Sequence, residues 1–280
     1  MGGSVRGSGY ELTMCGIAGY SLSEKSSVDR TLAAQALLAS IAERGADAVG
    51  YAYRTPGDPH AHVHKQRSGA SALLDEIHVP AAAVEALVHV RDYTKGHPRI
   101  EANNHPIRHG AIVGIHNGVI FNDEDVLEQN GFRRARPEMT VDSEAIFALA
   151  EEAQGRAHVF EQLRGSMACA WLDERRPDVL FIARGVGRPL WVGVGKHECF
   201  FASTTRALEI VEEYIAVRLR KHELDEGMLL ALTQGREAWC ERFRPDRHFE
   251  ERSLPPVRAP QEGASCLRRL ATLAAAPSSG

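Results

Sequence analysis

The chain has 280 residues, of which 44% are hydrophobic and 25% charged, a composition that excludes a fibrous or wholly disordered protein. Its 33 Lys and Arg residues against 37 Asp and Glu give a net charge of -4, so it has no overall positive field to hold nucleic acid or an anionic membrane. No apolar run approaches the roughly 20 residues that span a bilayer, and residues 1–14 lack the apolar core of a secretory signal. We therefore expect a cytoplasmic protein with neither nucleic acid nor membrane as a partner.

Apolar periodicity predicts a series of short strands and a few helices. Strands are predicted at 16–22, 49–53, 60–64, 87–90, 111–115, 119–121, 167–172, 179–183, 190–194, 198–202, 217–220, 228–232 and 238–243. Helices are predicted from a cap at Ser26 or Ser27 to Gly45, from Asp142 or Ser143 to 153, and over 204–215. Adjacent strands with few helices between them indicate an α+β protein, in which helices pack outside antiparallel sheets.

Cys15 directly follows an internal Met14 and directly precedes the first predicted strand. One interpretation is a small apolar residue that fills the start of a buried strand, as most isolated cysteines do. The other makes Cys15 the first residue of the mature chain. A free α-amino group, with a reference pKa of about 7.7 to 8.0, then serves as general base for the thiol of the same residue. This second interpretation requires the removal of everything before Cys15.

Seven short stretches, in order, resemble the motifs of class II glutamine amidotransferase domains, which are N-terminal-nucleophile hydrolases. They are the Cys-Gly-Ile of 15–19, the Arg-Gly-x-Asp-x-x-Gly of 44–50, the Arg-x-x-Thr-x-Gly of 91–96, the Asn-x-His-Pro of 103–106, His116-Asn117-Gly118, residues 141–144 and residues 187–190. Each is weak alone, but their order and spacing over residues 15–205 make coincidence improbable. The resemblance implies a four-layer αββα sandwich of two antiparallel sheets and no metal.

The resemblance also assigns the residues of catalysis. Cys15 becomes the nucleophile that attacks the γ-carbonyl of L-glutamine. The side-chain amide of Asn117 and the backbone N–H of Gly118 become the donors that stabilise the resulting oxyanion. Taken alone, an Asn-Gly dipeptide between apolar runs is typical of a hairpin turn. The neighbouring motifs favour the catalytic interpretation.

Free glutamine has two charged ends, so its site needs a guanidinium for the α-carboxylate and a carboxylate for the α-ammonium. The resemblance gives these roles to Arg91 and Asp142, although Asp142 by itself could only cap a helix and Arg91 by itself could be a surface charge. Thr94 and Gly96 are expected to complete the pocket wall, and His105 to support it without touching the substrate. Asp92 and Lys95 depart from the residues common in the family, which leaves the finer shape of the pocket open.

The histidines, the cysteines and the glycine-rich stretches of the sequence indicate no cofactor. His60, His62 and His64 alternate, which on a strand would place three imidazoles on one face, but a solvent-facing sheet edge is the preferred interpretation. The five cysteines are widely spaced with no Cys-x-x-Cys pair, so neither a disulfide framework nor a structural zinc site is expected, and Cys169 and Cys199 lie in apolar strands. Neither a phosphate loop nor a dinucleotide fingerprint is present, so ATP and NAD are not implied.

Three domain assignments follow. Residues 1–14 are expected to be a leader or a wrongly assigned start that is absent from the active form, residues 15–250 a glutaminase domain, and residues 251–280 a flexible tail. Within that tail, 266–275 could form one short helix, but its Ala and Leu residues have no evident second element to bury them. We assign the tail no function.

The leading functional hypothesis is hydrolysis of L-glutamine to L-glutamate and ammonia through a γ-glutamyl thioester on Cys15. About 75 residues follow Arg206, too few for an acceptor domain, so a separate synthase is expected to receive the ammonia. Two alternatives stay open. The N-terminal thiol could act on another small amide, such as a γ-glutamyl conjugate, or the chain could be a non-catalytic ligand-sensing or interaction module that retains the residues before Cys15.

Overall fold

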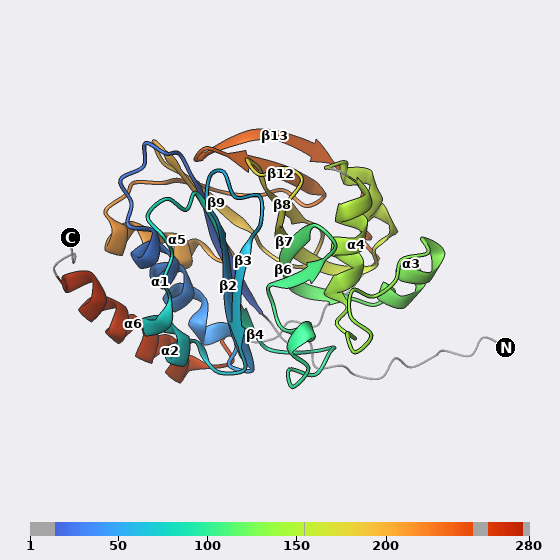
Figure 1. Cartoon of the computed structure of the whole chain (residues 1–280), viewed down its shortest axis with the longest axis horizontal. Helices are drawn as coiled ribbons and strands as arrows, with labels where there is room; N and C mark the ends of the chain where they lie inside the picture. Colours follow the sequence, from blue (N-terminus) through green and yellow to red (C-terminus); the bar gives the residue numbers. More distant parts are fainter. Residues whose placement is uncertain (1–14, 154, 249–256, 277–280) are drawn as a thin grey trace.

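The computed structural model describes residues 15–153, 155–248 and 257–276 as two stacked antiparallel sheets with helices on both outer faces (Figure 1). This confirms the predicted α+β class and its four layers. The expected leader, residues 1–14, lies outside the described residues. Within the described part of the chain, no helix is both long and apolar enough to cross a bilayer.

The first sheet has seven strands in the order β11-β9-β10-β1-β4-β2-β3. Their bounds are β1 Gly16–Leu22, β2 Ala48–Arg54, β3 His62–Gln66, β4 Glu85–Arg91, β9 Trp191–Val194, β10 Glu198–Ala202 and β11 Arg220–Glu223. Helices on its outer side are α1 Arg30–Ile41, α2 Ala70–Leu73, α5 Thr205–Ile215 and α6 Pro260–Ala275, with short 3-10 helices at η1 Ala42–Arg44 and η2 Leu74–Glu76. In Figure 1 these helices form the left-hand layer.

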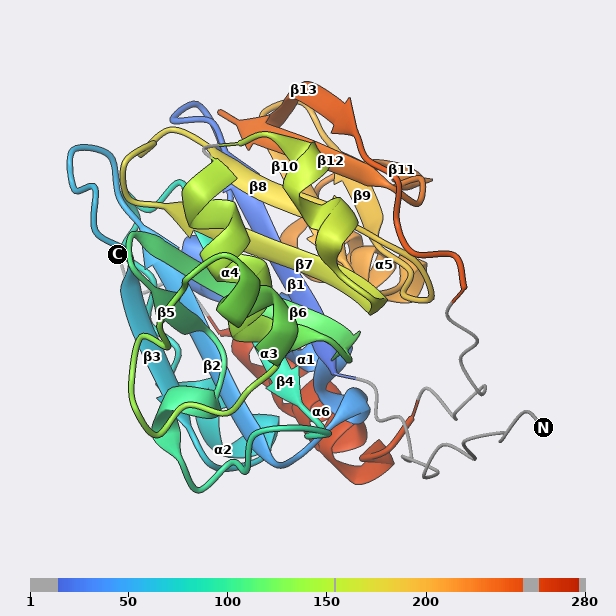
Figure 2. The same ribbon diagram turned by 90° about the vertical axis from the view of Figure 1, so that its right-hand side faces the viewer.

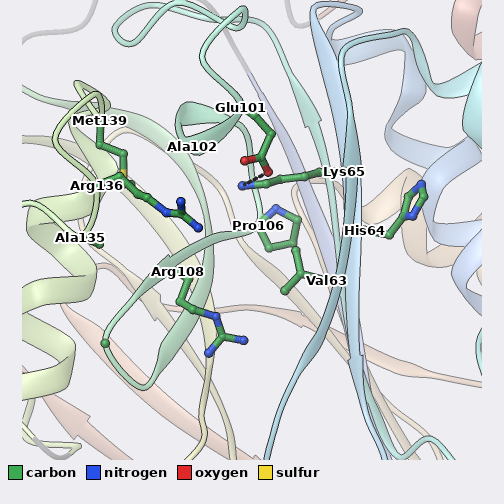
Figure 3. Close-up of a pocket in the computed structure, with 11 residues that line it drawn as sticks. Val63, His64, Lys65, Glu101, Ala102, Pro106, Arg108, Ala135, Arg136 and Met139 are labelled. Atoms are coloured by element: carbon green, nitrogen blue, oxygen red, sulfur yellow. Dashed lines mark ion pairs between the residues drawn. The ribbon is translucent and has the colours of Figure 1, made fainter.

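The second sheet has six strands in the order β13-β12-β8-β7-β6-β5. Their bounds are β5 Ile107–His109, β6 Ile112–Ile120, β7 Gly165–Asp173, β8 Leu180–Arg184, β12 Met228–Thr233 and β13 Arg236–Arg242. Helices α3 Asp123–Gln129 and α4 Ser143–Ala153 lie over this sheet in Figure 2, and 3-10 helices lie at η3 Glu101–Asn103 and η4 Ala157–Gln162. The short helices α2 and α3 and the strand β5 were not predicted from the sequence.

The space between the two sheets is filled by apolar side chains from both. Ile17, Leu87 and Phe201 of the first sheet meet Ile115 and Ala170 of the second, and all five are fully buried. All seven residues of β1 are buried, because this strand has a helix layer on one side and the second sheet on the other. Cys15 is therefore held at the end of a central strand with little freedom to move.

The helices α1 and α5 each begin at a residue whose side chain caps the helix, but the capping residue of α1 differs from the one predicted. The α1 helix was expected to begin at Ser26 or Ser27, but its N-cap is Asp29, whose carboxylate accepts from the Leu32 N–H at 2.9 Å. The hydroxyl of Ser26 instead donates to Glu198 at 2.7 Å, so it is committed to the adjoining sheet. The start of α5 is confirmed, with Thr204 accepting from the Ala207 N–H.

The Asn-Gly dipeptide makes no turn. β6 runs without a break through Asn117 and Gly118, which pair with Ala168 and Met167 of β7. Gly118 has φ +145°, and a Cβ at this position would lie 2.1 Å from the carbonyl oxygen of Ser166. Only glycine fits this backbone, so the local Asn-Gly signal marks a strained strand position rather than a hairpin.

The expectation of a flexible tail is wrong for residues 257–276. Pro260–Ala275 forms the helix α6, which packs on α1 and η1 (Figure 1). Cys266 and Leu270 are fully buried in the same core as α1, and Glu262 accepts hydrogen bonds from the N–H and hydroxyl of Ser71 in α2. The sequence shows the apolar stripe of this helix but not the distant surface that receives it.

A packed α6 predicts a measurable loss of stability on truncating its buried stripe. Leu270→Ala is expected to lower the free energy of unfolding by about 2 to 5 kcal/mol, because it leaves a cavity in the core shared with α1. The matched change Arg268→Ala, on the exposed side of the same helix, is expected to change it by less than about 0.5 kcal/mol. Equal effects of the two changes in denaturant unfolding would show that the helix is not docked.

Candidate active site

A small pocket lies where the end of β4 and the start of β1 face β6 of the second sheet. Its lining comes from five stretches: Cys15, residues 91–95, residue 105, residues 116 and 118, and residues 141–143. β1 and β4 are paired, with Gly16 opposite Val90, which places Cys15 beside Arg91. The cavity volume is only about 10 Å³, far below the roughly 300 to 1,000 Å³ of ordinary ligand pockets, so the pocket in this conformation is too small to hold an amino acid.

Two backbone contacts hold Cys15. Its carbonyl oxygen accepts from Nε of Arg44 at 2.9 Å, and its thiol donates to the carbonyl oxygen of Asp92 at 3.4 Å. Gly45, next to Arg44, lets this stretch approach β4, because a Cβ there would lie 2.5 Å from the Arg91 carbonyl. Burial raises the pKa of the Cys15 thiol above its usual value, although the Arg91 charge acts in the opposite sense. At neutral pH the thiol is therefore protonated, and a nucleophilic attack needs a base.

Arg91 is buried and holds the loop that covers the pocket. Its Nη1 donates to the side-chain oxygen of Asn104 at 2.6 Å, and its Nη2 donates to the carbonyls of Lys95, at 2.9 Å, and Gly96. Thr94 lies on the same loop and lines the pocket. Gly96 has φ +79°, and a Cβ there would lie 2.9 Å from the Cα of Val141. The guanidinium thus fixes segment 92–97 against the residues before α4.

Asp142 is buried in the pocket, but its carboxylate does not cap α4. Its Oδ2 accepts from the backbone N–H of Ile120 at 2.7 Å. Burial raises the pKa of Asp142 to about 6. A carboxylate that is costly to ionise when it stands alone is a natural partner for an incoming ammonium group.

Lys95, one of the two departures from the family pattern, ties the loop to α3. Its Nζ donates to both carboxylate oxygens of Asp123, at 2.7 and 2.9 Å, and to Glu124 at 3.3 Å. Asp123 is 1% exposed and also pairs with Arg134. The sequence offered no signal for this pair, because α3 itself was not predicted.

The side chain of Asn117 is fully buried, and neither its amide nitrogen nor its oxygen has a hydrogen-bond partner among the described residues. A buried polar group without a partner is rare in folded proteins. The next residue, Gly118, lines the pocket together with Cys15. Asn117 itself is not among the residues that line the pocket, so its unpaired amide lies one residue away from the lining, next to Gly118.

Three buried imidazoles lie around the pocket, and the charge of Arg91 acts on two of them, His89 and His105. His105 lines the pocket and stacks on His89 with ring centroids 4.4 Å apart. Nε2 of His89 donates to the carbonyl oxygen of His116, and His116 shares a hydrogen bond of 2.8 Å with the hydroxyl of Ser143. Burial lowers the pKa of all three histidines, so they are neutral at physiological pH. The sequence analysis gave His89 and His116 no role, although His116 begins the His-Asn-Gly motif and each lies within two residues of a predicted site residue.

The alternating histidines do not converge. His62 and His64 lie on the edge strand β3, as the alternation predicts. His62 stacks on Tyr53 of β2, and the ring of His64 lies tilted against Tyr51. His60 lies before β3 and contacts Glu174 at 3.2 Å. In the described part of the chain, no group of three or more His, Cys, Asp or Glu side chains is arranged to hold a metal ion.

Comparisons with known proteins show which family the chain resembles. A family model described as "Glutamine amidotransferase domain" matches residues 95–210. The chain is 28% identical over 247 residues to glutamine–fructose-6-phosphate aminotransferase (isomerizing) of Chlamydia muridarum, which covers 85% of this chain and 39% of that protein. It is 31% identical over 237 residues to the protein of the same name from Shigella flexneri, covering 79% and 36%. The chain thus spans between a third and two fifths of the length of these relatives.

Two solved structures have a similar fold. One is described as the allosteric regulatory enzyme of purine biosynthesis, with a TM-score of 0.63 and 18% identity. The other is glutamine phosphoribosylpyrophosphate amidotransferase from B. subtilis, with a TM-score of 0.61 and 19% identity. Each alignment covers 81% of this chain and 49% of the other. With the family model, the relatives and this shared fold, the chain belongs to the class II glutamine amidotransferase domain family of N-terminal-nucleophile hydrolases.

Proposed function

We propose that the chain hydrolyses L-glutamine to L-glutamate and ammonia through a γ-glutamyl thioester on Cys15. The observation that carries this proposal is the convergence of Cys15, Arg91, Asp142 and Gly118 on one pocket from four distant stretches of sequence. Together they offer a nucleophile, a cation, a carboxylate and a backbone donor. These are the groups that a free amino acid with a side-chain amide requires.

The chemistry begins with the Cys15 thiol, which its surroundings keep protonated. The free α-amine of Cys15 takes this proton, and the thiolate attacks the γ-carbonyl carbon of glutamine. Asn117 and the Gly118 N–H donate to the oxyanion that forms. The ammonium of Cys15 returns its proton to the departing nitrogen, which leaves as ammonia, and water then cleaves the thioester to release glutamate. This scheme requires an active form that begins at Cys15.

The two charged ends of glutamine are assigned to Arg91 and Asp142. The α-carboxylate competes with the Lys95 and Gly96 carbonyls for the Arg91 guanidinium, and the α-ammonium faces Asp142. Because the pocket is too small for glutamine, segment 92–97 must move outward to admit it and then return, with Thr94 and Gly96 as the pocket wall. His105 is expected to support Arg91 from its stack with His89.

We further propose that a separate synthase consumes the ammonia. The names of the relatives describe amino transfer from glutamine to fructose 6-phosphate by one longer protein, so they support an ammonia acceptor, and its placement on a separate chain is our proposal alone. The hydrolytic half is tested first, on protein that begins at Cys15, by measuring glutamate and ammonia released from L-glutamine in equal amounts. If γ-glutamyl methylamide were cleaved faster than glutamine, the substrate would be a γ-glutamyl conjugate instead.

The pH dependence of glutamine binding tests the role of Asp142. Its pKa of about 6 means that the carboxylate is ionised above this pH and protonated below it. Glutamine is therefore expected to bind about ten times more weakly at pH 5 than at pH 7. Calorimetry with the Cys15→Ala protein measures this affinity without turnover.

The Asp142→Asn protein is expected to bind glutamine weakly, with an affinity that does not change between pH 5 and pH 7. Asp225→Asn, a matched change at an exposed carboxylate, should keep the wild-type profile. A slope that survives in Asp142→Asn would assign the titration to another group.

A further inference from the structure

A second cavity adjoins the active-site pocket across the peptide that links His105 to Pro106. His105 lines the pocket, whereas Pro106 lines this cavity (Figure 3). The cavity has a volume of about 560 Å³, within the range of small-molecule sites. It lies between β3, η3, β5 and the loop at 135–139. Nothing in the proposed hydrolysis uses it.

Three cations surround this cavity. Figure 3 shows Arg136 and Arg108 reaching into it from one side and Lys65 facing them from β3. Two are partly neutralised, since Lys65 contacts Glu101 at 3.0 Å and Arg108 contacts Glu174 at 2.8 Å. Glu101 is 72% exposed, so its pairing with Lys65 is weak and easily exchanged.

Arg136 is the one of these three cations that has no acidic partner among the described residues. Its guanidinium has no hydrogen bond or ion pair with any described residue, whereas the nearby Arg134 pairs with Glu144. Its charge also acts on Lys65, whose pKa is lowered first by burial and further by Arg136. An anion placed between the two side chains would relieve this repulsion.

The remaining lining is mostly apolar. Val63, Ala102, Pro106 and Met139 contribute side chains, and His64 points away from the cavity towards Tyr51 (Figure 3). An arginine guanidinium can donate two parallel hydrogen bonds to two phosphate oxygens, and an apolar surface beside it can contact the rest of a small organic molecule. This concave site suits a compact phosphate-bearing molecule better than an extended acidic peptide.

Each side of the cavity is connected to one of the two residues proposed to bind glutamine, Arg91 on one side and Asp142 on the other. On one side, Lys65 donates to the carbonyl of Asn104 at 3.0 Å, and the side chain of Asn104 accepts from Arg91 at 2.6 Å. On the other side, the chain runs from Arg136 through Val141 to Asp142. An anion that bridges Lys65 and Arg136 would therefore clamp both segments in place.

We propose that this cavity binds a small phosphate-bearing molecule between Lys65, Arg108 and Arg136, and that its occupancy strengthens glutamine binding in the neighbouring pocket. The site itself does not depend on the proposed hydrolysis, whereas its effect on glutamine does. Ordering Arg91 and Asp142 before glutamine arrives lowers the cost of binding, which is the source of the coupling.

Pyrophosphate binding, measured by calorimetry at constant ionic strength on the Cys15→Ala protein, tests the site. Arg136→Gln is expected to weaken pyrophosphate at least about tenfold, because one charge-assisted contact is lost. Arg242→Gln, a matched change at an exposed arginine of β13, should leave the affinity unchanged. Equal affinity of the Arg136→Gln and Arg242→Gln proteins, or tighter binding of a tetraglutamate peptide than of pyrophosphate, overturns the proposal.

Glutamine titrations with and without saturating pyrophosphate test the coupling. Glutamine is expected to bind at least about five times more tightly with pyrophosphate present, and Lys65→Met, which removes the donor to Asn104, should abolish this gain. Unchanged glutamine affinity in pyrophosphate-saturated protein overturns the coupling. A protein that binds pyrophosphate but no glutamine at all would instead count against the proposed hydrolysis.

Discussion

Replacing Cys15 with alanine is expected to lower glutamate release from glutamine by more than about 10³-fold, the usual loss when a covalent nucleophile is removed. The thiol stands at the end of the fully buried strand β1, beside Arg91, in a pocket that Asp142 and Gly118 also line. No second sulfur lines that pocket among the described residues. Glutamate release under saturating glutamine measures the effect.

Cys240→Ala is the matched control, because Cys240 is a free, exposed thiol on β13 of the other sheet. It should retain full activity. Cys15→Ala should also keep the unfolding temperature of the parent protein, since the side chain is only partly buried. A Cys15→Ala protein that is folded and retains most of its activity contradicts the thioester mechanism.

Asn117→Leu is expected to lower kcat by about 10² to 10³-fold without loss of stability. The kinetic loss follows from removing one oxyanion donor. Stability should be unchanged or higher, because the buried amide has no partner among the described residues, and leucine of similar size leaves no polar group unpaired. Thermal unfolding and steady-state kinetics on the same preparation separate the two effects.

Asn103 offers a contrasting control. It is also fully buried, but its amide donates to Thr140 at 3.2 Å and its oxygen accepts from the N–H of Thr140 at 2.8 Å and of Val141 at 3.1 Å. Asn103→Leu should therefore destabilise the fold by about 1 to 3 kcal/mol for each group left unpaired. If Asn117→Leu destabilised the protein as much as Asn103→Leu, the Asn117 amide would be structural.

Elements whose signals are local could be predicted from the sequence. Residues 198–202 form β10 as expected, and Thr204 caps α5, because an apolar run and a capping hydroxyl act over a few residues. β11 begins at Arg220 rather than near 217, since its position is decided by pairing with β9. Single-strand patterns carry no such pairing information.

Where contacts between distant residues decide the conformation, the expectation from sequence differs from the structure. Asn117-Gly118 has the composition of a turn, yet β7 pairs along the whole of β6 and keeps it extended. Similarly, α6 was expected to lie unpacked, because nothing in residues 255–280 shows that α1 presents a matching apolar surface. Both differences reflect partners far away in the chain.

The candidate site was accessible to sequence reasoning because its residues lie in recognisable motifs. Cys15, Arg91 and Asp142 were named for separate reasons and line one pocket in the structure. The motifs could not predict how segment 92–97 is held, because they do not show that Lys95 donates to Asp123. That contact depends on a helix with no strong apolar pattern.

The central claim is that the attacking sulfur and its base belong to one terminal residue. The most direct test is intact-mass analysis of the protein after reaction with a glutamine analogue that carries an electrophile at the γ position. Only molecules that begin at Cys15 are predicted to gain the mass of the label. Equal labelling of molecules that still carry Gly2 would contradict the account, because their Cys15 nitrogen is locked in a peptide bond.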